Sequence, residues 1–263
     1  MSDTFLDKIL VKTRERVKTL KQNIAISTVI SRAEHARNTA EPHRFHFALE
    51  QADRTNIIAE IKRASPSKGV INAEIDVAEV AKSYESGGAA AISVLTETEF
   101  FDGSSADLIL VCKTVQIPVL RKDFIVDEYQ IYEAAAFGAD AILLIVAALT
   151  ENELIRFVRL AQDDLGMDAL VEVHTSHELA VANGIGANII GVNNRDLQTL
   201  KVSLDVSRHL IAERPVNTLM IAESGLSTRK EIEELKELGF DGFLIGETLM
   251  RTANAAETLG GWI

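Results

Sequence analysis

Short apolar runs alternate with amphipathic stretches along most of this chain. After about residue 55, eight such runs are rich in Val, Ile, Leu or Ala and lack a regular polar alternation. Runs of this kind are typical of parallel strands that are buried on both faces. The predicted strands cover residues 56–61, 90–95, 118–120, 141–145, 169–173, 189–192, 219–222 and 242–245.

Amphipathic helical patterns follow these runs, for example over residues 75–86, 127–137, 151–165 and 228–238. Alternation of strand and helix eight times favours a closed (β/α)8 barrel, the TIM barrel, over an open sheet. Glycines recur where predicted helices end before the even-numbered strands, and glycine accepts the left-handed backbone that stops a helix. These glycines are Gly88, Gly138, Gly186 and Gly239.

The first 55 residues have a different pattern. Phe5, Ile9, Val17 and Leu20 recur near helical spacing among charged residues, which predicts amphipathic helices. We therefore expect one α/β domain over residues 1–263, with a helical extension at 1–55 and the barrel at 56–263. A length of 263 residues is ordinary for such a barrel.

Composition narrows the classes of partner. The formal net charge of −12 disfavours nucleic acid and anionic membranes as partners. A single cysteine, Cys112, excludes an intrachain disulfide, and its apolar surroundings predict a core position. No secretory signal or long apolar span is visible in the sequence, so the expected location is the cytoplasm.

Charged residues interrupt the apolar strands near their ends, where the active sites of such barrels lie. Glu60 and Lys62 are two residues apart at the end of the first strand and therefore share a face. Lys122 follows the third strand, and Glu172 interrupts the fifth. Burial of a lone charge is costly, so these groups need partners or a substrate. Glu60 and Lys62 could alternatively form a purely structural ion pair. We expect a lowered pKa for Lys122, which would suit a general acid.

Two glycines after the last strands indicate an anion site. Gly225 follows the seventh strand and Gly246 the eighth, and barrels often bind phosphate between these loops. Ser65 lies in a polar loop, residues 65–69, that could fold over a ligand. Together with two Lys and two Glu, this constellation suits acid–base chemistry on a sugar phosphate. It requires no metal and no nucleotide, and His43 and His46 lack the further ligands of a metal site.

Six segments closely resemble those of indole-3-glycerol-phosphate synthases, in the family's order and over almost the whole chain. They are residues 58–69 (IAEIKRASPSKG), 93–97 (SVLTE), 121–125 (RKDFI), 170–173 (LVEV), 191–197 (GVNNRDL) and 222–225 (AESG). The resemblance implies ring closure of 1-(2-carboxyphenylamino)-1-deoxyribulose 5-phosphate to indole-3-glycerol phosphate, with loss of CO2 and water. This reaction serves tryptophan biosynthesis and needs no cofactor.

The resemblance also implies residue roles. Lys122 would protonate the ribulose carbonyl oxygen, and Lys62 would hold the substrate carboxylate and assist dehydration. Glu172 and Glu60 match catalytic glutamates, one of which would take a proton. Other matching residues position the substrate or the charged side chains, namely Asn193, Arg195 and Ser224.

The remaining matches form two substrate subsites. The phosphate would meet Gly225, Gly246, the next backbone N–H and Ser65. Glu247 stands where a small residue is expected, so only its N–H should face the phosphate while its side chain turns away. The flat ring would lie among apolar residues, namely Leu95, Phe101, Phe124, Leu143, Leu170, Leu197 and Leu226. By the same resemblance, the N-terminal helices should pack over the barrel mouth.

Two alternatives use the same fold. A Schiff-base aldolase acting on a sugar phosphate could use Lys122 or Lys62 as its nucleophile. A binding protein without turnover would keep the phosphate site, but the charged strand-end residues are all present here. The expected partner is therefore a small phosphorylated substrate, and the sequence leaves protein partners and oligomeric state open.

Overall fold

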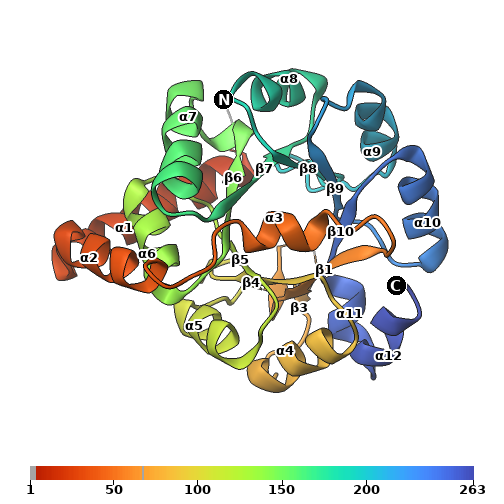
Figure 1. Cartoon of the computed structure of the whole chain (residues 1–263), viewed down its shortest axis with the longest axis horizontal. Coiled ribbons are helices and arrows are strands. Elements are labelled where there is room, and N and C mark those ends of the chain that lie inside the picture. The colour runs from red at the N-terminus through yellow and green to blue at the C-terminus, as the bar shows by residue number, and fades with distance from the viewer. Residues whose placement is uncertain (1–3, 67) are drawn as a thin grey trace.

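The computed structural model describes residues 4–66 and 68–263 and contains a closed barrel of eight parallel strands (Figure 1). Each predicted strand is present, with ends displaced by at most two residues. The parallel register runs around the whole ring and closes between the first strand and the last. The strands are β1 (Asn56–Ile61), β4 (Ala91–Leu95), β5 (Val119–Lys122), β6 (Ala141–Ile145), β7 (Asp168–Val173), β8 (Ile189–Asn193), β9 (Leu219–Glu223) and β10 (Gly242–Ile245).

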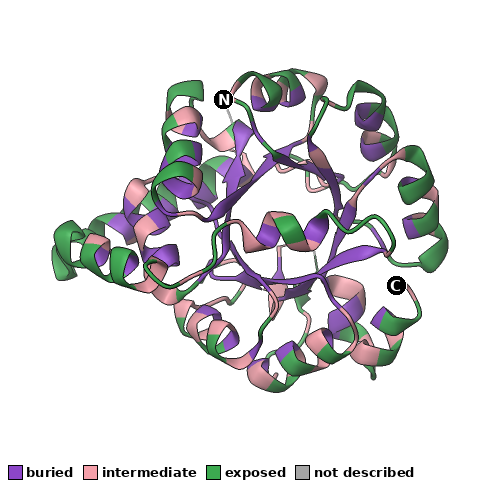
Figure 2. Ribbon diagram, viewed as in Figure 1, coloured by how far each residue is buried: buried purple, intermediate pink, exposed green. Residues whose placement is uncertain are grey.

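Helices surround the barrel and turn one face toward it, and Figure 2 shows their outer faces exposed. The four glycines predicted to stop helices all have positive φ angles. The surrounding helices are α4 (Val77–Ser86), α5 (Ser105–Thr114), α6 (Glu128–Phe137), α7 (Glu151–Arg159), α8 (Ser176–Gly184), α9 (Asp205–Leu210), α10 (Arg229–Leu238), α11 (Glu247–Arg251) and α12 (Ala255–Gly260). A π-helical turn, Leu160–Asp164, extends α7, and short 3-10 turns occupy Val146–Ala148 and Ile211–Glu213.

The apolar core has two main layers because successive strand side chains point to opposite sides of the barrel wall. Ile58 faces the barrel interior, whereas Ile57 packs outward against the helices. Cys112 is partly buried against the outer layer, which agrees with its predicted core position. After β1, an unpredicted hairpin of β2 (Ala64–Ser65) and β3 (Gly69–Val70) begins the loop that leads to α4. Ser67 lies outside the described residues.

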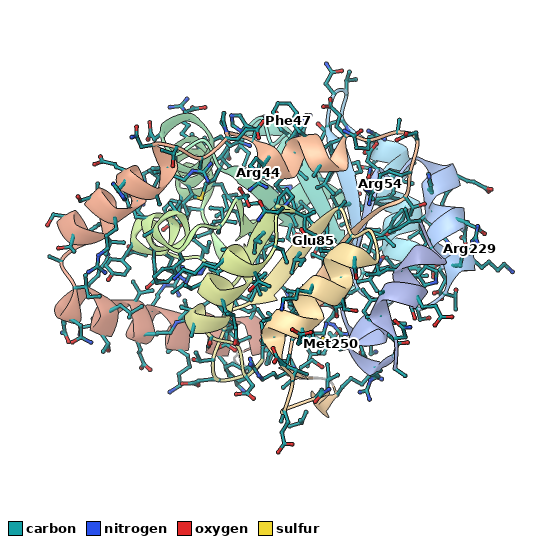
Figure 3. All side chains as sticks on the ribbon, turned by 60° about the horizontal axis from the view of Figure 1, so that its bottom comes forward. Arg44, Phe47, Arg54, Glu85, Arg229 and Met250 are labelled. Carbon is teal, nitrogen blue, oxygen red and sulfur yellow. The ribbon has the colours of Figure 1, made fainter. Side chains whose placement is uncertain are left out.

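The N-terminal extension reaches both ends of the barrel and corrects one prediction. Helix α1 (Phe5–Asn23) lies at the mouth, the end where the carboxyl ends of the strands meet, as predicted. Helix α2 (Ile26–Arg37) packs along α6. Helix α3 (Arg44–Leu49) instead covers the opposite end, where Asn56 at the start of β1 donates to the Leu49 carbonyl at 2.8 Å (Figure 1). In Figure 3, α1 and α3 lie at opposite ends of the molecule.

The wrong part of that prediction has a physical reason. The charged residues of α3 match carboxylates at the strand starts, so Arg44 pairs with Asp140 at 3.0 Å. The apolar residues Phe45 and Leu49 close the barrel interior from the same side, and both are fully buried. None of the helices in the described residues is long and apolar enough to cross a membrane.

Candidate active site

A single cavity at the barrel mouth collects nearly every residue that the sequence predicted for the site. It lies at the carboxyl ends of the strands, where β1, β5, β7, β8 and β9 each contribute a polar side chain. The predicted polar and glycine residues that line it are Glu60, Lys62, Ser65, Lys122, Glu172, Asn193, Arg195, Ser224, Gly225, Gly246 and Glu247. The strand ends therefore bring together groups that are up to 187 positions apart, from Glu60 to Glu247, in the sequence.

Glu60 and Lys62 form the first ion pair of the cavity. Lys62 Nζ donates to Glu60 Oε1 at 2.5 Å, which confirms that the two side chains share a face. Gly246 makes this arrangement possible, because a β-carbon there would lie 2.4 Å from Glu60 Oε1. The last strand must therefore end in glycine for the Glu60 carboxylate to keep its position.

Lys122 lies between two carboxylates. Its Nζ donates to Glu172 Oε2 at 2.9 Å and to Glu223 Oε2 at 2.7 Å. The lowered pKa predicted for Lys122 is wrong. Burial lowers the pKa of this ammonium, but the charges of Glu172, Glu223 and Glu60 outweigh burial and raise it. Lys122 is therefore a charged hydrogen-bond donor, because its surroundings are carboxylate-rich rather than cationic.

Glu223 is a charged residue of the cavity that sequence reasoning did not assign to the site. Its side chain is almost fully buried, and burial raises its pKa to about 7 although Lys122 opposes this effect. Its Oε1 has no hydrogen-bond partner among the described residues and lies over Gly191, where a β-carbon would come within 2.0 Å. The sequence did contain a signal, since Glu223 ends the seventh apolar strand just as Lys62 and Lys122 end theirs.

Asn193 and Arg195 lie at the tip of β8. Asn193 Oδ1 accepts the backbone N–H of Arg195 at 2.9 Å, and Arg195 Nη1 donates to the Leu200 carbonyl at 3.1 Å. Burial lowers the pKa of Arg195, while the charges of Glu247 and Glu60 oppose this shift. The guanidinium is thus held near both carboxylates and supplies local positive charge in a chain whose net charge is negative.

One end of the cavity has the features of an anion site. Ser224 and Gly225 both have positive φ, at 65° and 81°, so the chain turns sharply after β9. The Ser65 hydroxyl is buried and has no hydrogen-bond partner among the described residues. Glu247 also lines the cavity, and its carboxylate lies 3.3 Å from Arg251 Nε, one turn along its own helix, and 3.9 Å from Lys68 Nζ. Two cations therefore offset the Glu247 charge.

The other end of the cavity is apolar. Phe101 and Phe124 lie with ring centroids 6.2 Å apart, and Phe5 of α1 also lines the cavity, which the sequence did not predict. Leu170 does not line the cavity. It is fully buried two residues before Glu172 on the same face of β7, so it lies one layer deeper in the barrel. The predicted ring residues that do line the cavity are Leu95, Phe101, Phe124, Leu143, Leu197 and Leu226.

The histidines singled out in the N-terminal segment lie far from this cavity. His43 Nδ1 is 3.1 Å from Asp168 Oδ1 at the opposite end of the barrel, and the His46 backbone N–H donates to the same carboxylate. Within residues 4–66 and 68–263 no group of three or more His, Cys, Asp or Glu is arranged to hold a metal ion.

Comparisons with known proteins agree with this geometry. Residues 6–260 match the model of the family described as indole-3-glycerol phosphate synthase. A protein of that name from Lachnoclostridium phytofermentans is 46% identical over 258 residues, covering 95% of both chains. The namesake from Chloroherpeton thalassium is 45% identical over 262 residues, covering 98% of both.

One solved structure supports the fold alone. The thiamine phosphate pyrophosphorylase from Pyrococcus furiosus superposes with a TM-score of 0.59 over 79% of this chain and 93% of its own. Its sequence identity is only 14%, so the likeness concerns the arrangement of strands and helices and not the chemistry of the site.

Proposed function

The chain belongs to the indole-3-glycerol phosphate synthase family, and from this we propose how its residues divide the work of the reaction. It is a decarboxylating lyase of tryptophan biosynthesis that acts on a small phosphorylated substrate. The reaction closes the indole ring of 1-(2-carboxyphenylamino)-1-deoxyribulose 5-phosphate and releases CO2 and water. We further propose that it takes place in the cytoplasm, as expected of a biosynthetic enzyme whose chain has a single cysteine.

Lys122 is the general acid of ring closure. As the aromatic carbon attacks the ribulose carbonyl, the carbonyl oxygen becomes an alkoxide and needs a proton. An alkoxide is a stronger base than an amine, so an ammonium with a raised pKa still donates to it. The observation that carries this assignment is the position of Lys122 Nζ, which Glu172 and Glu223 hold at the mouth of the cavity.

The glutamates and Lys62 serve the later steps. Loss of CO2 from the ring carbon that attacked returns an electron pair to the ring and restores its aromaticity without removing a proton, whereas the final dehydration needs both a base and an acid. Glu172 beside Lys122 and Glu60 beside Lys62 supply two such acid–base pairs on opposite sides of the cavity. Glu223, whose pKa lies near 7, accepts or releases a proton readily at neutral pH and keeps Lys122 in place.

The two ends of the cavity bind the two ends of the substrate. The turn at Ser224 and Gly225, the backbone of Gly246 and the unpaired hydroxyl of Ser65 receive the phosphate. The apolar end, which includes Phe101 and Phe124, receives the anthranilate ring. The substrate carbonyl is thereby brought to the Lys122 ammonium between them.

A Schiff-base aldolase fits this site less well. Such a mechanism needs a neutral amine as nucleophile, and lysines that serve this purpose have lowered pKa values. The raised pKa of Lys122 keeps its amine protonated. Borohydride reduction in the presence of substrate should therefore trap no covalent adduct at Lys122.

Lys122→Met tests the assignment directly. The variant keeps the length of the side chain but has no proton to donate, so kcat should fall by about 10²-fold or more. Indole formation from the carboxyphenylamino-deoxyribulose phosphate would be followed by its fluorescence, with a melting curve to show that the variant folds. A folded variant that keeps near-normal turnover would contradict the assignment.

A further inference from the structure

A buried ion network is centred on Asp123, which follows Lys122 in the chain and also lines the cavity. The Asp123 carboxylate is fully buried and accepts the Thr96 hydroxyl at 2.7 Å and Arg121 Nη2 at 3.1 Å. Arg16 Nη2 lies 2.8 and 2.9 Å from its two oxygens. Burial by itself raises the pKa of Asp123, but the charges of Arg121 and Arg16 outweigh it and lower the pKa. Asp123 is therefore ionised and fully engaged.

This network controls the backbone next to two functional side chains. Asp123 Oδ1 accepts the backbone N–H of Phe124 at 2.9 Å, which ties the carboxylate to the chain just beyond Lys122. Phe124 and Lys122 both line the cavity, and Phe124 lies at its apolar end. Because Asp123 stands between them, a shift of its carboxylate moves both side chains.

Arg16 is the only contact to the Asp123 carboxylate, among the described residues, that comes from outside the barrel. It projects from α1, its side chain is 23% exposed, and its Nη1 donates to the Thr96 carbonyl at 3.3 Å. Thr96 and Asp123 follow β4 and β5, so Arg16 joins the ends of two neighbouring strands. Arg16 does not line the cavity, whereas Phe5 on the same helix does.

We propose that Arg16 is a positioning residue that fixes the tip of β5, and with it Lys122, by bridging the ends of β4 and β5 from the N-terminal helix. The proposal rests on the assignment of Lys122 as the general acid. A guanidinium suits this position because its planar fork binds a carboxylate and a carbonyl at the same time. The N-terminal extension is therefore part of the catalytic apparatus as well as of the fold.

Arg16→Gln should lower kcat because the freed tip of β5 misplaces the Lys122 ammonium, and displacements of about 1 Å cost up to 10²-fold in rate. We expect kcat to fall about tenfold or more, while KM changes less than kcat, because Arg16 does not itself line the cavity and Phe124 is one of several apolar residues at that end. Free guanidinium at millimolar concentration should restore part of kcat by occupying the vacated position. A loss caused by general loosening of the fold would not be rescued in this way.

Lys21→Gln is the matched control. Lys21 belongs to the same helix and pairs with Asp127 at 2.6 Å, at the surface and away from the cavity. This variant should keep its kcat, and guanidinium should have no effect on it. If Arg16→Gln keeps normal kcat, or loses activity without rescue and to the same extent as Lys21→Gln, the positioning role is wrong.

Lys122→Met, assayed in parallel, separates the two proposals. If Lys122→Met is inactive while Arg16→Gln is normal, the acid assignment stands and the positioning role fails. If Lys122→Met retains turnover, the acid assignment itself fails, whatever the Arg16 variant does.

Discussion

Buried charged groups have different ion-pair and hydrogen-bond partners at the two ends of the barrel. At the end covered by α3, the buried carboxylates Asp140 and Asp168 each have a side-chain partner and a backbone donor. Asp140 pairs with Arg44 at 3.0 Å and accepts the Val119 N–H at 2.9 Å, while Asp168 contacts His43. Such groups are satisfied, and their role is to hold helix and strands together.

At the mouth, two carboxylates share one cation, and some of their hydrogen-bonding capacity is unused among the described residues. Lys122 Nζ pairs with both Glu172 and Glu223, and one oxygen of Glu223 has no hydrogen-bond partner among the described residues. Groups left in this state are costly to the fold but free to move protons. The comparison shows that one barrel uses buried charge for stability at one end and for chemistry at the other.

Gly191→Ala would break the arrangement at the mouth. The added β-carbon would lie 2.0 Å from Glu223 Oε1, so the carboxylate must leave the position in which its other oxygen accepts from Lys122. We expect kcat to fall by about 10²-fold, the scale of a catalytic group displaced by about 1 Å. Turnover at saturating substrate is the measurement.

Gly184→Ala provides the control for that experiment. Apart from the chain neighbours and the backbone of α8 itself, no atom of the described residues lies within 4 Å of a β-carbon at Gly184, which ends α8 without a positive φ. This variant should keep its kcat and gain up to about 1 kcal/mol in stability. Equal activity of the two alanine variants would show that the space over Gly191 does not matter.

Arg44→Met would break the ion pair with Asp140 at the end of the barrel covered by α3. Asp140 would remain buried without its cation, and the free energy of unfolding should fall by about 1–3 kcal/mol. Burial already raises the pKa of Asp140 above its ordinary value, so its ionisation costs stability as pH rises. The deficit should therefore be larger near about pH 8 than near about pH 5, measured by urea unfolding.

Activity is the contrasting measurement for the Arg44 variant. The Arg44–Asp140 ion pair lies at the end of the barrel away from the cavity. Figure 3 shows Arg44 on the same helix as Phe47, whose side chain is exposed. A folded Arg44→Met variant should therefore keep kcat unchanged. A selective loss of kcat would mean that the two ends are coupled.

The pH dependence of kcat/KM would test whether Glu223 ionises as its place at the mouth predicts. Burial raises the pKa of Glu223 to about 7, and only its ionised form holds Lys122 as an ion pair. We therefore expect kcat/KM to rise as pH increases through about 7, with a change of about tenfold per pH unit below that value. In Glu223→Gln this limb should disappear, and persistence of the limb would assign it to another group.

The strands and the charged strand ends were predictable from local pattern, whereas the ring subsite and the residue roles were predicted from the family resemblance alone. Apolar runs locate the strands, and a charge at a strand end such as Glu60 or Lys122 must face the mouth. The sequence did not show the environment of Lys122, because its pKa depends on Glu223, which lies 101 residues away. The place of α3 was missed for the same reason, since its partners at the strand starts belong to distant segments.

Gly191 and Gly246 also show that local sequence does not reveal contacts between distant segments. Both permit a carboxylate on another strand to approach the backbone, and nothing in the local sequence indicates which carboxylate that is. The motif that contains residue 191 resembles the family, but the physical reason for the glycine appears only once Glu223 is placed beside it.

The double attachment of the N-terminal segment also bears on how the chain is made. The partner of Arg16, Asp123, lies 107 residues downstream, and the partner of His43, Asp168, lies 125 residues downstream. During synthesis, Arg16 and His43 leave the ribosome well before their partners, so docking of α1 and α3 follows emergence of the middle strands. Nascent chains that stop before about residue 170 should leave these amphipathic helices uncovered and open to chaperones.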